Sequence, residues 1–266
     1  MSMLDMSVLY VHTTPINVLD MSNLYMFCLL QAVMGIERFK TKHDVFDDAT
    51  NRVLFALMSK GVFSGLESPI AIGKEANVFI GKKDVERLTV KIYRVNVCDF
   101  AKMYSCIRTD PRFPNLTNNR RKVVFAWTKR EFRNLLIARE AGVRVPTPFA
   151  FKDNVLVMEL IGQPAQRLIT QSPSNPRMFA KELIKEVERL AKTDLIHGEL
   201  SPFNILNYNE KPVLIDFSQA TTSRDPNARE YLHRDVVNLT TYFNKQGVKM
   251  PDDWEKKLTK MLFKNN

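Results

Sequence analysis

The sequence predicts an α+β fold of two lobes, with a sheet-rich N-lobe followed by a helical C-lobe. Strand-like apolar runs come first and helical patterns dominate later, an order typical of α+β chains. The 266 residues suffice for one two-lobed domain or two small ones. Strands are expected at Ile70–Ile72, Asn77–Ile80, Leu88–Tyr93, Val145–Phe151, Val155–Leu160 and Val213–Asp216.

Helices are predicted from apolar residues that recur at helical spacing. Asp47–Lys60 has such a stripe, with Asp48 as a suitable N-cap and Gly61 just past its end. Val123–Ala141 is a second helix. A third helix begins at Asn175–Pro176, because proline is favoured in the first helical turn.

The turns and the longest connection follow from proline, glycine and polar residues. Turns are expected at Gly81–Asp84 and Lys152–Asn154. Asp99–Lys122 holds two prolines and six basic against two acidic residues, with little periodicity, and we expect a mobile loop there. This loop is either a solvated connection or a contact for a polyanionic partner.

The chain divides into an N-terminal segment at 1–44, an N-lobe at 45–160 and a C-lobe at 161–266. The apolar run Leu24–Ile36 is too short to span a bilayer, which takes about 20 residues. No basic region precedes it, so a signal peptide is not expected. The first segment is either disordered or the result of a start codon assigned too early, with Met34 as the alternative start.

Composition indicates an anion-binding protein of a reducing compartment. The chain carries 39 Lys and Arg against 29 Asp and Glu, a net charge of +10. Such a surface favours nucleic acid, ribonucleoprotein or nucleotide phosphates, although solubility alone also explains it. Cys28, Cys98 and Cys106 show neither metal-ligand nor disulfide spacing, and we expect a cytoplasmic location.

Five sequence features together match the needs of phosphoryl transfer. That reaction needs a loop over the phosphates, a lysine held by a carboxylate, oxygen ligands for Mg²⁺ and a carboxylate that orients the nucleophile. The candidates are the loop Gly73–Phe79, Lys91, Glu131, the segment His197–Asn204 and Asp216.

These features differ in how specific they are. A loop with one glycine is weak support, Lys91 alone could be a lysine whose stem crosses a sheet edge, and Glu131 alone could be a surface charge. The combination His-Gly-x-Leu-x-x-x-Asn, followed twelve residues after Asn204 by Asp216 in Ile-Asp-Phe, is strong. Its alternative explanation is a turn followed by a capped strand end.

Several motifs together resemble the RIO family of atypical serine/threonine kinases. The matching segments are Gly73–Phe79, Val90–Arg94, Ala126–Leu135, Val155–Gly162 and Leu214–Ala220. Ser68–Glu75 and the helix at Arg52–Val62 are most similar to the type-one branch. The resemblance covers roughly residues 45–245. It implies a protein-kinase-like fold that lacks the activation loop and the late C-lobe helices.

The resemblance also implies roles for individual residues, with ATP and Mg²⁺ as cofactors. Glu199 and Asp216 would be catalytic, and Asn204 and Asp216 would hold the metal ion. Asp216 would also be able to accept the phosphoryl group as an acyl phosphate. The ATP-binding residues would be Gly73, Lys74, Glu75, Val78, Lys91, Glu131, Met158, Glu159, Leu160 and Ile161.

By the same resemblance, the chain would act in late maturation of the small ribosomal subunit. The expected partner is therefore a pre-ribosomal small-subunit particle, through its protein and its RNA. We expect no membrane or DNA partner.

Two departures from the family pattern bear on activity. Glu199 stands where the family has its catalytic aspartate; the reference pKa values are similar, about 4.3 against 3.9, but the side chain is one methylene longer. A misplacement of about an ångström can cost about a hundredfold in rate. Ser68 and Ala71 stand where the family usually has glycine and serine, which removes a hydroxyl and some flexibility.

Two other functions stay open. The chain could be a weakly active ATP-binding assembly factor, and Glu199 is the residue that separates this alternative from a kinase or ATPase. A small-molecule kinase of the aminoglycoside type shares His-Gly-x-Leu and Ile-Asp-Phe. Gly73–Val78 and Phe217–Ala220 argue against that assignment.

Overall fold

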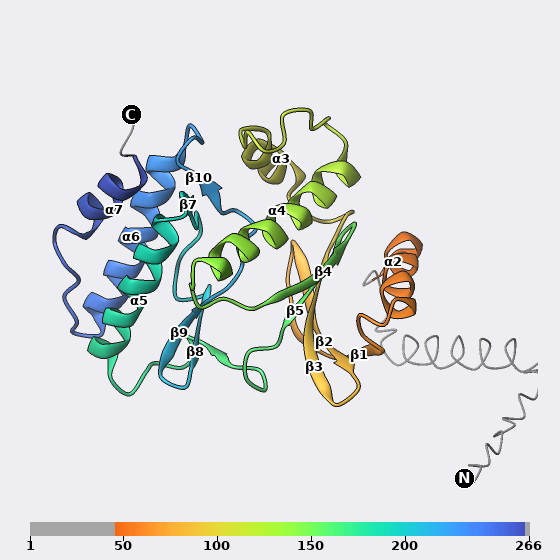
Figure 1. Cartoon of the computed structure of the whole chain (residues 1–266), viewed down its shortest axis with the longest axis horizontal. Coiled ribbons are helices and arrows are strands. Elements are labelled where there is room, and N and C mark those ends of the chain that lie inside the picture. Colours follow the sequence, from red (N-terminus) through yellow and green to blue (C-terminus); the bar gives the residue numbers. More distant parts are fainter. Residues whose placement is uncertain (1–45, 264–266) are drawn as a thin grey trace, which may run out of the picture. The chain divides into compact units, whose positions relative to one another are not determined.

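The computed structural model describes residues 46–263, and both lobes belong to one compact unit. Element labels follow Figure 1 and begin with α2. The predicted N-terminal segment 1–44, with Met34 as its alternative start, and Cys28 lie outside the described residues. The lobe boundary after residue 160 stays a prediction.

A single antiparallel sheet forms the N-lobe, with strand order β1-β2-β3-β5-β4. Its strands are β1 (Gly65–Ile72), β2 (Ala76–Lys83), β3 (Glu86–Tyr93), β4 (Pro148–Lys152) and β5 (Val155–Glu159). All five predicted N-lobe strands exist, but the first is longer than predicted and the fourth starts at Pro148. Gly81 lies within β2, where a Cβ would come within 2.7 Å of the Val90 side chain, and the turn falls at Asp84 instead.

The two faces of this sheet are covered by different helices. Val155 and Val157 of β5 share a core with α2 (Asp48–Ser59), whereas Leu156 and Met158 point to the other face and share a core with α4 (Arg120–Glu140). Figure 1 shows α2 and α4 on opposite sides of the sheet. This alternation follows from the two-residue period of a strand.

The first helix is capped one residue earlier than predicted. The carboxylate of Asp47, and not that of Asp48, accepts a hydrogen bond from the backbone N–H of Thr50 at 2.7 Å. Both residues suit an N-cap, and tertiary packing of Thr50 in the core selects the frame. Gly61 ends the helix with a positive φ of 68°, as expected for this position.

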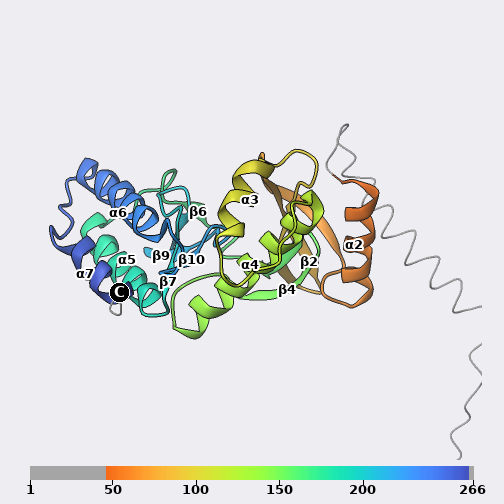
Figure 2. The same cartoon turned by 90° about the horizontal axis from the view of Figure 1, so that it is seen from above.

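The region predicted as a mobile loop contains a helix, α3 (Phe100–Arg108), and that prediction is wrong. Met103 and Ile107 are fully buried and share a core with Val123, Val124 and Trp127 of α4. Figures 1 and 2 show α3 beside α4. With only two fully buried residues at helical spacing, α3 shows little periodicity in the sequence, and α4 supplies the surface that stabilises it.

The C-lobe is mainly helical, with two small sheets. Its helices are α5 (Pro176–Ala191), α6 (Ala228–Lys245) and α7 (Trp254–Leu262). Its strands are β6 (Gln166–Arg167), β7 (Leu195–Ile196), β8 (Ile205–Tyr208), β9 (Lys211–Leu214) and β10 (Thr221–Thr222). The α5 helix starts as predicted, with Asn175 accepting from the N–H of Met178 at 3.0 Å. Within residues 46–263, no helix is long and apolar enough to cross a bilayer.

One continuous apolar core joins the two lobes. Leu135 of α4 and Leu156 of β5 belong to the same cluster of buried side chains as Leu183, Phe217 and Leu239 of the C-lobe. This shared core holds α4, β5 and the segment after β9 against one another, and β3 is attached to it by pairing with β5. Lys91, Glu131 and Asp216 lie on β3, on α4 and in the segment after β9, and the other predicted site residues lie in the β1–β2 turn, on β2, at or just after the end of β5 and in the loop before β8.

Candidate active site

Lys91 lies at the centre of a buried ion-pair cluster that joins both lobes. Its ammonium group contacts Glu131 Oε1 and Asp216 Oδ1, each at 2.8 Å. The Lys91 side chain is 8% exposed and that of Glu131 is 0% exposed. Lys91 is therefore not an edge lysine with a solvated head, and Glu131 is not a surface charge. Three residues predicted from separate motifs meet at one point.

The charges in this cluster support one another. Burial lowers the pKa of Lys91, but Asp216 and Glu131 outweigh it and raise that pKa well above its ordinary value. Burial raises the pKa of Glu131, which Lys91 opposes, and the Tyr93 hydroxyl donates to Glu131 Oε2. Burial also raises the pKa of Asp216, but Lys91 outweighs it and lowers that pKa to about 2. Lys91 and Asp216 are therefore both ionised at neutral pH.

Asp216 and Asn204 fit the oxygen ligands that Mg²⁺ prefers. Lys91 and the Ser218 hydroxyl both donate to Oδ1 of Asp216, each at 2.8 Å, so Oδ2 carries neither bond. The side-chain nitrogen of Asn204 donates to the Glu199 carbonyl at 2.9 Å, so its oxygen carries no part of that bond. The N–H of Ile215 donates to the Asn204 carbonyl at 3.0 Å, which places the two candidate ligands on adjacent backbone segments.

A magnesium ion here would depend on more than protein ligands. Within residues 46–263, no group of three or more His, Cys, Asp or Glu side chains could hold a metal ion. Mg²⁺ commonly takes one or two carboxylates and completes its shell with substrate phosphates and water. Asp216 and Asn204 suit such a site.

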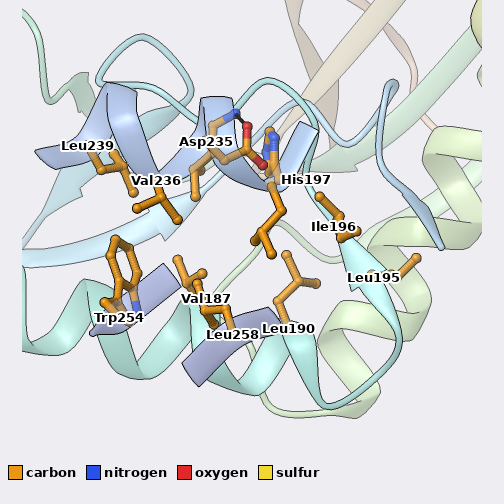
Figure 3. A pocket seen from close by; sticks show the side chains of 12 residues that line it. Val187, Leu190, Leu195, Ile196, His197, Asp235, Val236, Leu239, Trp254 and Leu258 are labelled. Atoms are coloured by element: carbon orange, nitrogen blue, oxygen red, sulfur yellow. Dashed lines mark hydrogen bonds between the residues drawn. The ribbon is translucent and has the colours of Figure 1, made fainter. Parts of the chain in front are cut away.

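A buried aspartate that the sequence did not reveal holds the loop at His197–Asn204. Asp235 on α6 accepts hydrogen bonds from the N–H groups of Gly198 at 2.8 Å and Leu200 at 2.7 Å. Figure 3 shows Asp235 beside His197 among apolar side chains of the helices. Burial raises the pKa of Asp235 to about 7. An aspartate on an amphipathic helix reads as a solvent-facing charge, so only the packing shows its role.

His197 is a structural part of this loop. Its Nε2 donates to the Ile215 carbonyl at 3.0 Å, and its ring lies 4.8 Å from that of Phe217. Burial lowers the pKa of His197 below its usual value, so the ring is neutral. It connects the loop that carries Glu199 to the segment that carries Asp216.

The Glu199 carboxylate pairs with a lysine of α3. Its Oε1 lies 2.9 Å from the ammonium group of Lys102 on α3, and that group also lies 3.9 Å from Glu75 Oε1. The Glu199 side chain is 31% exposed. Lys102 was not among the predicted site residues, because the sequence placed it in a loop.

The phosphate-loop candidates form the turn between β1 and β2. The N–H of Gly73 donates to the Ala76 carbonyl at 3.0 Å, and a Cβ on Gly73 would lie 2.9 Å from that oxygen. This close approach requires glycine. Lys74 is exposed, Glu75 and Val78 are half-buried, and the two departures Ser68 and Ala71 lie within β1 rather than in the turn.

Four of the residues predicted to bind ATP, Met158 to Ile161, lie at and just after the end of β5. Met158 is buried and pairs with Thr89 of β3, and Glu159 pairs with Leu88. The Glu159 carboxylate accepts from the N–H and the hydroxyl of Thr147, at 3.0 and 2.6 Å. Its side chain is thus occupied, and an adenine contact would use the backbone of residues 159–161. The nucleotide-binding roles of these residues stay predictions.

Comparisons with known proteins identify the family of this chain. The RIO domain family matches residues 77–256. The chain is 42% identical over 223 residues to a RIO-type serine/threonine-protein kinase Rio1 from Haloferax volcanii, covering 82% of this chain and 76% of that protein. It is 36% identical over 217 residues to the protein of that name from Methanocaldococcus jannaschii, covering 80% and 74%.

The fold is also shared with a solved structure. The Rio2 kinase from Chaetomium thermophilum, determined as an ADP/Mg²⁺–phosphoaspartate complex, aligns with a TM-score of 0.65 and 25% identity. The alignment covers 81% of this chain and 67% of that one. The kinase-like fold predicted from the sequence is thereby confirmed. This chain belongs to the RIO family of serine/threonine kinases, in its type-one branch.

Proposed function

We propose that the chain is an ATP- and Mg²⁺-dependent serine/threonine protein kinase or ATPase. The observation that carries this proposal is Lys91 bridging Glu131 and Asp216, each at 2.8 Å. A buried lysine with two carboxylate partners stays charged. Such a cation is suited to offset the charge on phosphate oxygens, which is the main requirement of phosphoryl transfer.

The other residues have distinct roles in this proposal. Asp216 and Asn204 would hold Mg²⁺, which supplies positive charge to the phosphate oxygens when it is bound. Glu199 orients the nucleophile and accepts its proton. A new P–O bond forms to the acceptor oxygen while the bond to the β–γ bridging oxygen breaks, and ADP leaves with that oxygen.

Asp216 itself is the proposed acceptor in the ATPase form of the reaction. Its Oδ2 carries neither of the two hydrogen bonds that Oδ1 accepts. The Rio2 structure contains a phosphoaspartate, which supports the same chemistry here. Water would then cleave the acyl phosphate and release inorganic phosphate.

A single-turnover experiment tests this function. The wild-type protein is incubated with γ-labelled ATP and Mg²⁺, and the labelled protein is treated with hydroxylamine, which cleaves acyl phosphates. We expect hydroxylamine-sensitive label on wild type and none on Asp216→Asn. Asp84→Asn, at an exposed turn, is the matched control and should label normally. If the wild-type protein binds ATP but is not labelled and does not hydrolyse it, the result would contradict the enzyme function and favour the assembly-factor function.

We further propose a cytoplasmic role with a pre-ribosomal small-subunit particle. The net charge of +10 supports it, as do the exposed side chains of Arg108, Arg121 and Lys122. Arg112 of the same region is instead paired with Asp110 inside the protein. Binding through phosphates should weaken steeply with salt.

The partner is tested by sedimentation with small ribosomal subunits over a series of salt concentrations. We expect Arg121→Ala combined with Lys122→Ala to lower both the affinity and its salt dependence. Binding that is absent at low salt, or that does not change with salt, would contradict this partner.

One observation favours the weakly active assembly factor as a second candidate. Glu199, the proposed base, is already paired with Lys102 at 2.9 Å. A carboxylate that already contacts an ammonium group has fewer lone pairs left to accept a hydrogen bond from a nucleophile. The Glu199 variants described in the Discussion separate the two functions.

A further inference from the structure

The segment between β3 and α4 brings a lysine into the candidate active site. This segment contains α3, and Lys102 on α3 lies between the turn that joins β1 to β2 and the loop at His197–Asn204. Its ammonium group is 2.9 Å from Glu199 Oε1 and 3.9 Å from Glu75 Oε1. Burial lowers the pKa of Lys102, but its hydrogen bond to Glu199 outweighs this and raises that pKa. Lys102 therefore stays protonated beside Glu199.

This ion pair is too exposed to be a device for stability. The side chains of Lys102 and Glu199 are 45% and 31% exposed. Exposed pairs contribute about 0–1 kcal/mol, because water and salt screen them and two long side chains lose entropy. The pair forms because the fold places the two residues next to each other. The contacts that hold α3 in place therefore determine the position of Lys102.

The start of α3 is anchored by its own helix contacts. Met103 and Ile107 are fully buried against α4. The Asp99 carboxylate caps the helix by accepting from the N–H of Lys102 at 3.1 Å. The Arg120 guanidinium lies 5.2 Å from the centre of the Phe100 ring. The turn that presents Lys102 is thus held on both sides.

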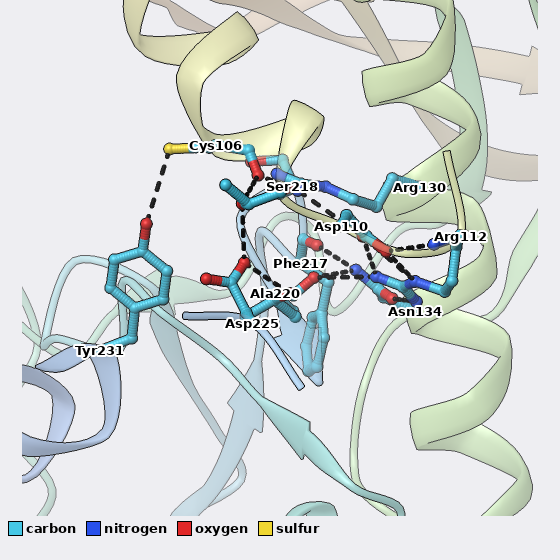
Figure 4. A network of polar contacts seen from close by, with 12 residues as sticks. Cys106, Asp110, Arg112, Arg130, Asn134, Phe217, Ser218, Ala220, Asp225 and Tyr231 are labelled. Atoms are coloured by element: carbon cyan, nitrogen blue, oxygen red, sulfur yellow. Dashed lines mark hydrogen bonds and ion pairs between the residues drawn. The ribbon is translucent and has the colours of Figure 1, made fainter. Parts of the chain in front are cut away.

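The end of α3 is anchored by a buried polar network, which Figure 4 shows. Arg112 donates to both carboxylate oxygens of Asp110, at 2.6 Å and 2.9 Å for the shortest bond to each, and to Asn134 Oδ1 at 2.6 Å. Asn134 in turn donates to the carbonyls of Phe217 at 3.0 Å and Ala220 at 2.7 Å.

A second connection in this network runs through Arg130. Its Nε donates to the Ser218 carbonyl at 2.9 Å, and its NH1 donates to the Cys106 carbonyl at 3.3 Å. Arg130 and Asn134 flank Glu131 on α4, so one helix holds Lys91, the end of α3 and the segment after Asp216. The position of Lys102 is therefore coupled to that of the segment that carries Asp216.

We propose that Lys102 is a positioning residue that fixes the Glu199 carboxylate for phosphoryl transfer. This inference rests on the proposed function. A glutamate has one more rotatable bond than the aspartate of the family pattern, so its carboxylate has more positions to occupy. Lys102 restricts these positions through the contact at 2.9 Å. Its effect therefore appears in kcat rather than in the KM for ATP.

The test is a kinetic series with Lys102→Met and Lys102→Arg. We expect Lys102→Met to lower kcat by about tenfold to a hundredfold, the cost of a misplaced group, with little change in the KM for ATP. Lys102→Arg keeps the charge and should recover most of the rate. Lys60→Met, at an exposed lysine that follows the last residue of α2, is the matched control for the lost charge and should not change kcat.

A double-mutant cycle separates positioning from a purely structural effect. Combined with Glu199→Ala, Lys102→Met should add no more than about twofold, whereas independent effects would multiply. If Glu199→Ala is too slow to measure, Glu199→Asp serves as the background, because its shorter side chain reaches Lys102 less well. There the loss on removing Lys102 should be smaller than in wild type.

The outcomes distinguish this inference from the proposed function. A wild-type protein without turnover or label would contradict the function itself. Normal wild-type turnover with an undiminished Lys102→Met loss in both Glu199 backgrounds would overturn the positioning role alone. A raised KM for ATP at constant kcat would assign Lys102 to nucleotide binding and would overturn it as well.

Discussion

The candidate active site contains two lysine–carboxylate clusters that differ in their exposure. In the cluster of Lys91 with Glu131 and Asp216, the Lys91 and Glu131 side chains are 8% and 0% exposed, and that of Asp216 is 34% exposed. Lys102 with Glu199 and Glu75 has each side chain between 31% and 45% exposed. The shortest ion-pair distances are nearly equal, 2.8 Å and 2.9 Å. The same chemistry is therefore present in two different dielectric surroundings.

This difference determines what each cluster tolerates. Removing one partner of a buried pair leaves a charge without compensation, which typically costs about 3–5 kcal/mol. Removing one partner of an exposed pair leaves a charge that water solvates. We therefore expect substitutions in the buried cluster to affect both stability and the proposed activity, and substitutions in the exposed cluster to affect the proposed activity alone. The family departure, Glu199, lies in the cluster that tolerates change.

The largest effect is expected for Lys91→Met. Turnover should fall by about a thousandfold or more, because a preorganised charge at the phosphates is lost. The free energy of unfolding should also drop by about 3–5 kcal/mol, since Glu131 is left buried without its cation. Thermal unfolding and ATPase assays measure both effects, with Lys60→Met as the control. A folded variant with wild-type turnover would show that the site is wrongly assigned.

Glu199→Ala should distinguish the two clusters, because it should lower turnover without lowering the free energy of unfolding. Turnover is expected to fall by about a hundredfold or more, within the usual range for a general base. The free energy of unfolding should change by no more than about 0.5 kcal/mol, as for other surface changes. If the rate matches wild type while ATP still binds, Glu199 is not catalytic and the assembly-factor function takes its place.

The pH dependence of stability tests buried carboxylates with different partners. Asp216 faces Lys91 and has a pKa of about 2, so its stabilising contribution is present above the unfolded pKa near 4 and is lost only as pH falls toward 2. Asp235 faces backbone N–H groups and has a pKa raised to about 7. Its contribution is therefore largest below pH 4 and is lost as pH rises to about 7.

Asp235→Asn checks that sign directly. The stability of wild type relative to this variant should decrease between about pH 4 and 7 and stay level above it. Loss of one of the two backbone hydrogen bonds would lower the stability of the variant by the same amount at every pH. The informative quantity is therefore the change with pH of the difference in free energy of unfolding between wild type and variant. Asp84→Asn at an exposed turn should show no such slope. A pH-independent difference for Asp235→Asn would contradict an ionisation in this window.

The smallest effect is expected for Glu199→Asp. The shorter side chain restores the carboxylate reach of the family pattern but weakens the contact with Lys102 at 2.9 Å. These two changes oppose each other, and we expect turnover to stay at the wild-type level or to rise. Steady-state ATPase rates measure it. A loss as large as that of Glu199→Ala would show that the longer side chain is required.

The sequence alone determined the N-lobe strands, the helices α2, α4 and α5, and the residues of the buried cluster, but not α6 or α7. Period-two apolar runs identified the N-lobe sheet, and Asn175 with Pro176 marked the start of α5. Lys91, Glu131 and Asp216 were recognisable because phosphoryl transfer restricts which residue types occur in that order. These features depend on local patterns of residues, which can be recognised in the amino-acid sequence.

Only the tertiary structure decided which distant residues meet. Lys102 and Glu199 are 97 positions apart, and the two N–H groups that Asp235 binds lie 35 and 37 positions before it. The α3 helix was missed because its few apolar residues depend on α4 for burial. Asp235 was missed because a buried carboxylate and a solvent-facing one look alike in the sequence. In each case the deciding quantity is a packing contact between segments far apart in the chain, which no local periodicity encodes.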